Sequence, residues 1–312
     1  MDNVSSYDIN IPSVLNSRTI LPVIVGLNDF VNNSDARVLN IDFSDTVVAY
    51  PGGLTPLAAS LLYLKDAPKC FECRVTRSFN AEFDNYLTNM DFYKLFGKTY
   101  DCVDKSVPGS FQELYSFSKN TYENDINLRA SKIAGIFAQN SDNPNFKDSI
   151  GWCITEIVDN AYTHSNSDVS VIFAQHYKNE CRSEFCVADT GIGIRRSMDK
   201  PDIFAALREC ITRAKGPNSK GKGNGLYYSS QLVKGDTSKK SMMTIHSENA
   251  VLTISNAGEA VIKPVEAFWN GVIVTFSVYN NIESSLSQLK KNDGFLDLGA
   301  DDFGIGQIFM TD

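Results

Sequence analysis

The sequence predicts a mixed α/β fold of the α+β sandwich type, and three features of the chain point to it. Short apolar runs of strand length alternate with longer helical runs in the first third of the 312 residues. From residue 146 onward, a long helix is followed by a strand, a glycine-rich loop, a second helix and three further strands. The chain is also longer than one compact core usually organises, so we expect two domains.

The strand-to-helix units of the first third are predicted as follows. Residues 38–50 form apolar strand segments, and a helical run follows over 54–64 after a Pro-Gly-Gly break. A second strand over 73–75 precedes a helix over 81–96, which ends at Gly97, a residue suited to a helix C-cap.

The rest of the chain is expected to hold the larger domain. A helix over 127–139 ends at a polar turn rich in Asn. We therefore divide the chain into a smaller α/β domain over 1–115, a helical linker over 116–145, a second domain over 146–281 and a C-terminal tail over 282–312.

Composition and charge restrict the function classes. Hydrophobic residues make up 43% of the chain and charged residues 21%, which excludes disorder and fibrous repeats. The net charge of −8 disfavours broad binding to nucleic acid or anionic lipid. No basic region precedes an apolar one at the start of the sequence, and no apolar run is long enough to span a bilayer. We expect a cytoplasmic protein, and a bacterial cytosol fits.

The cysteines favour reduced thiols. Their number is seven, which is odd, and they are scattered over a long chain, unlike a disulfide framework. Cys70 and Cys73 form a CxxC pair, but no second pair follows at zinc spacing, so packing is the expected role of both.

The helix that begins near residue 146 carries the first candidate functional residues. Glu156 and Asn160 are four residues apart, so they share one helix face, together with His164. An Asn side chain offers an oxygen to a hard Mg²⁺ ion, and a neighbouring carboxylate can take a proton from an attacking nucleophile. Taken alone, the pair is also typical of an exposed helix face.

The next strand ends at a second candidate, Asp189. Its carboxylate can accept a hydrogen bond from an exocyclic amine such as that of adenine. Gly191 and Gly193 let the backbone turn tightly beside a flat ligand. A dinucleotide-binding fingerprint does not fit, because Arg196 occupies the place of its third glycine.

A glycine-rich loop opens the second helix and forms the third candidate. Glycines at the start of a helix expose N–H groups at its positive end, which is a natural phosphate site. The candidate residues are Gly221, Lys222, Gly223, Gly225 and Leu226. The overlapping stretch GPNSKGK is close to a P-loop, but Gly223 replaces the Mg²⁺-binding Ser or Thr and the preceding residues look helical.

In this order and spacing, the blocks EIVDNA, DTGIGI and GKGNGL resemble the N box and the two glycine boxes of the GHKL superfamily. This superfamily contains gyrases, heat-shock chaperones of the ninety-kilodalton class, histidine kinases and MutL proteins. The resemblance covers about residues 146–280 and is nearest in style to histidine-kinase-like and anti-sigma-kinase-like ATPases. It implies a Bergerat-type ATP-binding domain in which a mixed sheet carries nucleotide between its helices and a mobile lid over 195–220.

The resemblance also implies roles for single residues. Glu156 would be the general base or water-orienting residue, Asn160 the Mg²⁺ ligand and Asp189 the adenine anchor. Gly191 and Gly193 would shape the adenine side. The phosphate side would use Gly221, Lys222, Gly223, Gly225 and Leu226.

One position departs from the superfamily pattern. A Gly-Thr pair often enters a late strand in these proteins, with the Thr supporting the adenine network, whereas here Gly271 is followed by Val272. Thr275 comes three residues later.

Residues 38–100 resemble the sulfate-transporter and anti-sigma-antagonist (STAS) fold, which implies a STAS-like domain before the ATP-binding domain. A generic βαβ layer is the alternative, because such units recur in many unrelated proteins.

Together these resemblances imply an Mg²⁺-dependent ATP-binding protein whose slow hydrolysis drives lid closure and partner switching in a cytoplasmic regulatory or defence system. One alternative is a serine/threonine protein kinase of the anti-sigma type, in which Glu156 deprotonates a protein hydroxyl instead of water. Another is an ATP-gated binding module without hydrolysis. Water and a protein hydroxyl need the same cradle and base, so the sequence leaves these open. A protein regulator and a homodimer fit this interpretation, whereas a membrane or nucleic acid does not.

Overall fold

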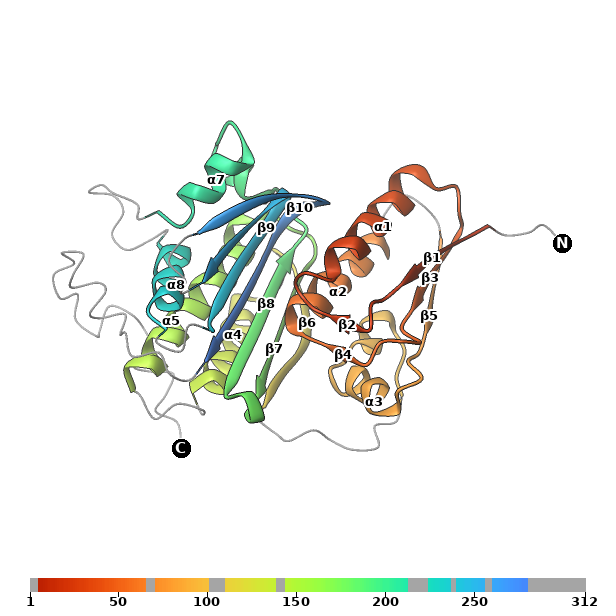
Figure 1. Ribbon diagram of the computed structural model, residues 1–312, viewed down its shortest axis with the longest axis horizontal. Helices are drawn as coiled ribbons and strands as arrows, with labels where there is room; N and C mark the ends of the chain where they lie inside the picture. Colours follow the sequence, from red (N-terminus) through yellow and green to blue (C-terminus); the bar gives the residue numbers. More distant parts are fainter. Residues whose placement is uncertain are drawn as a thin grey trace.

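The computed structural model describes residues 5–65, 71–100, 110–138, 144–212, 224–236, 240–255 and 260–279, and they form a mixed α/β fold (Figure 1). The helices are α1 (Ile20–Asn33), α2 (Pro51–Lys65), α3 (Ala81–Asn89), α4 (Glu123–Ala138), α5 (Pro144–Asp159), α6 (Gly193–Ser197), α7 (Ile203–Glu209) and α8 (Gly225–Lys234). The strands are β1 (Ser6–Asn10), β2 (Val14–Leu15), β3 (Val38–Asp42), β4 (Val48–Ala49), β5 (Glu72–Thr76), β6 (Phe111–Phe117), β7 (Ser170–Tyr177), β8 (Arg182–Asp189), β9 (Met242–Ser255) and β10 (Val261–Tyr279).

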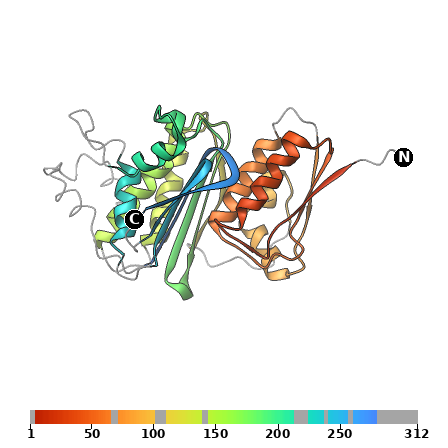
Figure 2. The ribbon, with the colours of Figure 1, turned by 45° about the horizontal axis from the view of Figure 1, so that its top comes forward.

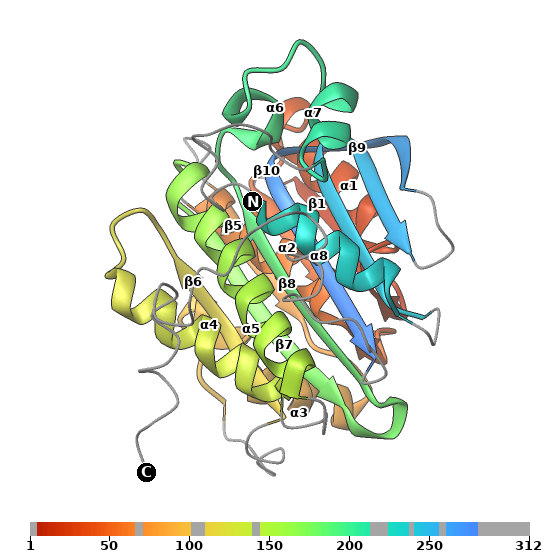
Figure 3. The ribbon, with the colours of Figure 1, turned by 90° about the vertical axis from the view of Figure 1, so that its left-hand side faces the viewer.

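These elements stack in layers (Figures 1 and 2). A parallel sheet of order β1-β3-β5 lies outermost, and α1 and α2 pack between it and a larger sheet of order β6-β7-β8-β10-β9. Helices α4, α5 and α8 cover the opposite face of the larger sheet, as the view onto that face shows (Figure 3).

The larger sheet is antiparallel throughout the described residues, so the expectation of a mixed sheet is wrong. The connections from β7 to β8 and from β9 to β10 are short, and short connections allow only antiparallel neighbours. The expected boundary at residue 115 falls within β6, which pairs with β7 at the edge of this sheet. Helix α4, expected in a linker, packs beside α5 and against β6.

Helix α2 explains how the layers are joined. Its residues are buried from Pro51 to Leu61, because one side meets the small sheet and the other meets β7 and β8. A helix enclosed in this way needs an apolar surface all round, and its sequence has no charged residue before Lys65. The helical run predicted over 54–64 is therefore confirmed, and it starts three residues earlier.

The apolar core between α1, α2 and the larger sheet is continuous. It contains Leu54 and Leu57 of α2 together with Phe173 of β7 and Ile273 of β10. A second core lies between the other face of the sheet and helices α4, α5 and α8. The larger sheet is therefore buried on both faces.

Hydrogen bonds also join the larger sheet to the elements that precede it in the chain, from β1 to α3, which we call the N-terminal layer. The Gly52 N–H donates to Glu184 Oε1 at 3.0 Å, and the Tyr86 hydroxyl donates to Gln175 Oε1 at 2.8 Å. Asn28 Nδ2 donates to the Phe268 carbonyl at 2.7 Å. The N-terminal layer is thus fixed to the larger sheet by side-chain hydrogen bonds as well as by apolar packing.

Several local predictions can be compared with the structure. The helix predicted over 81–96 is divided into α3 and a 3₁₀ turn over Tyr93–Phe96, and Gly97 follows it with φ of +72°, as a left-handed C-cap requires. The Asn80 side chain caps α3 by accepting from the Phe83 N–H. None of the described helices is both long enough and apolar enough to cross a bilayer.

Candidate functional site

A cavity of about 970 Å³ lies on the face of the larger sheet that α5 and α8 cover, at the end where β8 finishes. Its walls come from α5 and the turn after it, the end of β8, the middle of β10, and helices α6, α7 and α8. The lining residues include Ile157, Asn160, Ala161, His164, Val187, Asp189, Gly193, Ile194, Met198, Ala205, Arg208, Cys210, Leu226, Val272 and Val274. This volume is in the range of ligand-binding pockets.

Asp189 is the buried charged group of this cavity. It is 3% exposed, and its carboxylate accepts hydrogen bonds from the backbone N–H groups of Gly191, at 3.0 Å, and Val272. No cationic side chain in the described residues forms an ion pair with it. Burial raises the pKa of Asp189 to about 7, and the two backbone hydrogen bonds lower it only in part.

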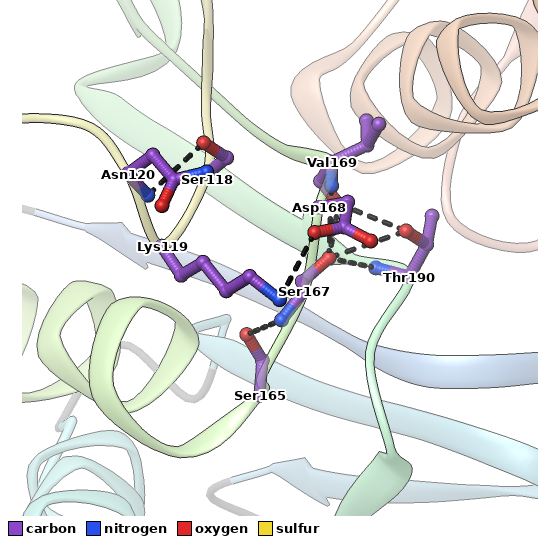
Figure 4. A network of polar contacts seen from close by, with 8 residues as sticks. All are labelled: Ser118, Lys119, Asn120, Ser165, Ser167, Asp168, Val169 and Thr190. Atoms are coloured by element: carbon purple, nitrogen blue, oxygen red, sulfur yellow. Dashed lines mark hydrogen bonds and ion pairs between the residues drawn. The ribbon is translucent and has the colours of Figure 1, made fainter. Parts of the chain in front are cut away.

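The turn after Asp189 is held by the loop that follows α5 (Figure 4). Ser167 Oγ accepts from the Thr190 N–H at 3.1 Å and donates to the Val169 carbonyl at 2.6 Å. The Ile192 N–H donates to the Ser165 carbonyl at 2.8 Å. Asp189 therefore sits at the start of a fixed turn.

The two predicted glycines of this turn are required by the protein's own packing. A Cβ on Gly191 would lie 2.0 Å from the Ser165 carbonyl oxygen. Gly193 has φ of +76°, and a Cβ there would lie 2.6 Å from the Asn270 carbonyl oxygen. The protein's own backbone therefore excludes a side chain at both positions, whether or not a ligand is bound.

Strand β10 supplies contacts to Asp189 that the sequence did not predict. Trp269 Nε1 donates to the Asp189 carbonyl at 2.8 Å, and a Cβ on Gly271 would lie 2.0 Å from the same oxygen. The register of β10 against β9 shifts on both sides of Trp269, so the ladder is irregular at this residue. Val272, at the position that departs from the superfamily pattern, donates its backbone N–H to the Asp189 carboxylate. Thr275 lies on the opposite face of the sheet, toward α2.

Asn160 and His164 lie on the cavity wall, as their shared helix face predicts. Asn160 begins a π-helical turn, Asn160–His164, that ends α5. Single π turns inside helices are frequent at functional sites. The turn places Asn160 beside the space that Asp189 also lines.

Glu156 lies one turn before Asn160 and packs against the start of α8. A Cβ on Gly225 would lie 2.5 Å from Glu156 Cβ and 3.0 Å from Glu156 Oε2, so only glycine fits there. Leu226, the next residue, lines the cavity. The structure thus brings Glu156, Asn160, Asp189, Gly193, Gly225 and Leu226 to one region. The other predicted loop residues, Gly221, Lys222 and Gly223, lie outside the described residues.

The first part of the predicted lid is helical. Asp202 caps α7 by accepting from the Ala205 N–H at 2.8 Å, and α7 contributes Ala205 and Arg208 to the cavity wall. Arg195, one of the basic residues near the site, is paired with Glu248, with Nε and Oε1 2.7 Å apart. The residues over 213–220 lie outside the description.

Within the described ranges, no group of three or more His, Cys, Asp or Glu side chains is arranged to hold a metal ion. Cys73 is a free thiol, and Cys70 lies outside the described residues. Asn160, the residue predicted to bind Mg²⁺, lines the cavity.

Comparison with known proteins adds no relative: no protein-family model matches the chain, and no curated protein does.

Proposed function

We propose that the cavity binds ATP with Mg²⁺, that Asp189 accepts the exocyclic amine of adenine, and that the chain hydrolyses ATP slowly. The observation that carries this proposal is Asp189 itself. A carboxylate buried in a cavity wall, with two backbone donors and no cationic partner among the described residues, retains acceptor capacity that a donor ligand would use.

The rest of the cavity supports a ligand with a flat apolar part and an anionic part. Ile157, Val187 and Val274 offer apolar surface on the side of the sheet where Asp189 lies. At the other side, α8 begins beside the cavity with Gly225 and Leu226, and the N-terminus of a helix favours phosphate.

The residues present fit an Mg²⁺ ion that is held mainly by the nucleotide. Mg²⁺ usually keeps several waters and takes one or two protein oxygens besides phosphate. Asn160 would supply such an oxygen, and the ion would neutralise phosphate charge. Glu156, next to the start of α8, would accept the proton of the attacking water.

The proposal extends to regulation. Helices α6 and α7 form one wall of the cavity, so their position relative to β10 would respond to bound nucleotide. A change there would alter which protein partner is bound, in a cytoplasmic regulatory or defence system.

The test of turnover uses the full chain with Mg²⁺ and γ-labelled ATP, followed by separation of free phosphate from labelled protein. We expect free phosphate from the wild type, a rate lower by about 10² to 10⁴ for Glu156→Gln, and retained ATP binding in that variant. Glu266→Gln, which changes an exposed glutamate on β10, is the matched control and should turn over normally.

Three other outcomes of this experiment would each favour a different interpretation. Label on the protein would favour the kinase of the anti-sigma type over hydrolysis. Binding without turnover would favour the ATP-gated module. Absence of ATP binding by the wild type would contradict the whole proposal.

A further inference from the structure

A second cavity, of about 300 Å³, lies at the junction between the N-terminal layer and the larger sheet, on the sheet face opposite Asp189. Its walls come from the loop before α1, the residue before α2, and the adjacent strands β8, β10 and β9. The lining residues are Asn16, Ser17, Arg18, Tyr50, Arg182, Glu184, Lys240, Met242, Thr275, Ser277 and Tyr279.

Strand register explains why so many polar groups meet here. Thr275, Ser277 and Tyr279 alternate along β10, so they point to the same face. Ser277 is paired with Glu184 and Tyr279 with Arg182 on β8, which brings both charged residues to that face. This end of the junction is polar, whereas its other end, at Ile273, belongs to the apolar core.

The charge of the cavity is positive. Arg18, Arg182 and Lys240 contribute three cationic side chains, and among the described lining residues Glu184 is the one carboxylate. Glu184 already accepts from the Gly52 N–H at 3.0 Å and from Arg182 Nη1 at 2.6 Å. The negative charge of Glu184 is therefore largely neutralised by Arg182. The cavity is thus a positive site in a chain whose net charge is −8.

Arg182 is the buried cation of the group. It is 8% exposed, and its guanidinium lies 4.2 Å from the ring centroid of Tyr177 and 5.1 Å from that of Tyr50. Nε is bound to Glu180 and Nη1 to Glu184, but Nη2 has no acceptor in the described residues. A fixed guanidinium with donors to spare is suited to an oxyanion.

The other two cations are exposed at the cavity and come from different layers. Arg18 belongs to the N-terminal layer and Lys240 precedes β9. Neither forms an ion pair with a carboxylate in the part of the chain that the structure describes. The cavity thus joins cations from both sides of the junction with the hydroxyls of Ser17, Thr275 and Ser277.

We propose that this second cavity binds a small oxyanion, namely phosphate or the phosphate group of a small metabolite. Arg182 and Lys240 would hold the anion from the sheet side and Arg18 from the N-terminal layer, so the ligand would strengthen the junction between them. The proposal is independent of the proposed ATP site, because the two cavities lie on opposite faces of the sheet.

The test measures binding of inorganic phosphate and of glycerol phosphate by titration calorimetry, with chloride at matched ionic strength as the reference. We expect saturable binding in the millimolar range or tighter, which weakens as salt is raised. Arg18→Gln and Lys240→Gln should each lower the affinity about three- to tenfold. Tighter binding of glycerol phosphate would identify a metabolite, and tighter binding of inorganic phosphate would identify the free ion.

Lys263→Gln is the matched control, because Lys263 is an exposed lysine of β10 outside the cavity. It should bind phosphate as the wild type does, and ATP should not compete with phosphate. The proposal is overturned if neither anion binds more than chloride, if Arg18→Gln and Lys240→Gln bind as the wild type does, or if ATP displaces the phosphate.

Discussion

Strand β8 carries two buried carboxylates, Glu184 and Asp189, and they are placed in opposite ways. They are five residues apart, so they face opposite sides of the sheet. Glu184 lies at the junction with α2, and its two oxygens are bound to Arg182 and to the Gly52 N–H. Asp189 lies in the wall of the large cavity, where its donors among the described residues are backbone N–H groups.

Burial of a charged group does not by itself indicate a binding site. Burial raises the pKa of both carboxyl groups. What differs is the kind of partner: Glu184 is paired with the cationic side chain of Arg182, whereas the donors to Asp189 among the described residues are backbone N–H groups, beside a space of about 970 Å³. Glu184 therefore holds the layers together, and Asp189 is the group that we propose to bind the ligand.

The largest expected effect concerns Glu184. Replacing Glu184 by Ala leaves Arg182 buried with one partner fewer and the Gly52 N–H without its acceptor. The free energy of unfolding should fall by about 3 to 5 kcal/mol. Urea unfolding of Glu184→Ala and of Asp189→Ala measures the contrast. An equal or greater loss for Asp189→Ala would break the distinction between the two carboxylates.

The second effect is the pH dependence of stability. The pKa of Asp189 is about 7 in the folded protein, against 3.8 for an ordinary aspartate, so the folded state holds the proton more tightly. The stability that the protonated group contributes is complete below about pH 4 and is lost as the pH rises to about 7. This loss should reach about 3 to 4 kcal/mol.

Unfolding of the wild type and of Asp189→Asn at several pH values isolates this effect, because Asn cannot titrate. The difference in free energy of unfolding between the two should change in favour of Asp189→Asn from about pH 4 to pH 7. A difference that is constant over this range would mean that Asp189 titrates as an exposed aspartate does.

The smallest effect concerns the turn after Asp189. Gly191→Ala places a Cβ against the Ser165 carbonyl, so the loop or the turn must shift. We expect a loss of about 1 to 3 kcal/mol without any ligand, seen as a lower unfolding temperature. Gly135→Ala is the matched control, because nothing lies within 4 Å of a Cβ at that position of α4. Equal stability of Gly191→Ala and wild type would mean that the turn is not fixed as described.

The sequence predicted the parts of the site that depend on local spacing. The interval of four residues placed Asn160 and His164 on one wall, and the end of an apolar run placed Asp189 at the end of its strand. It did not predict Trp269, whose contact with Asp189 depends on register shifts in a strand 80 residues away. It also did not predict the roles of Ser165 and Ser167, because their partners Ile192 and Thr190 are brought near only by the fold.

The fold was predictable to a similar degree. The alternation of strands and helices gave the α/β class, and an apolar run predicted α2 because its burial on all sides is a property of its own sequence. The short connections from β7 to β8 and from β9 to β10 favour antiparallel pairs, so this part of the sheet order was accessible from the sequence. The junction of the larger sheet with α2 could not be predicted, because it depends on pairs such as Gly52 and Glu184, 132 residues apart.

Calorimetry of ATP binding with Mg²⁺ is the most direct test of the proposed hydrogen bond from bound adenine to Asp189. Asp189→Asn should lower ATP affinity by about ten- to a hundredfold or more, because the amide is a weaker acceptor and offers a donor to a donor. Asp35→Asn, at an exposed position of the N-terminal layer, should bind as the wild type does. ATP affinity of the wild type should also rise with pH up to about 7, as the carboxylate forms. Unchanged ATP affinity in folded Asp189→Asn would contradict the account.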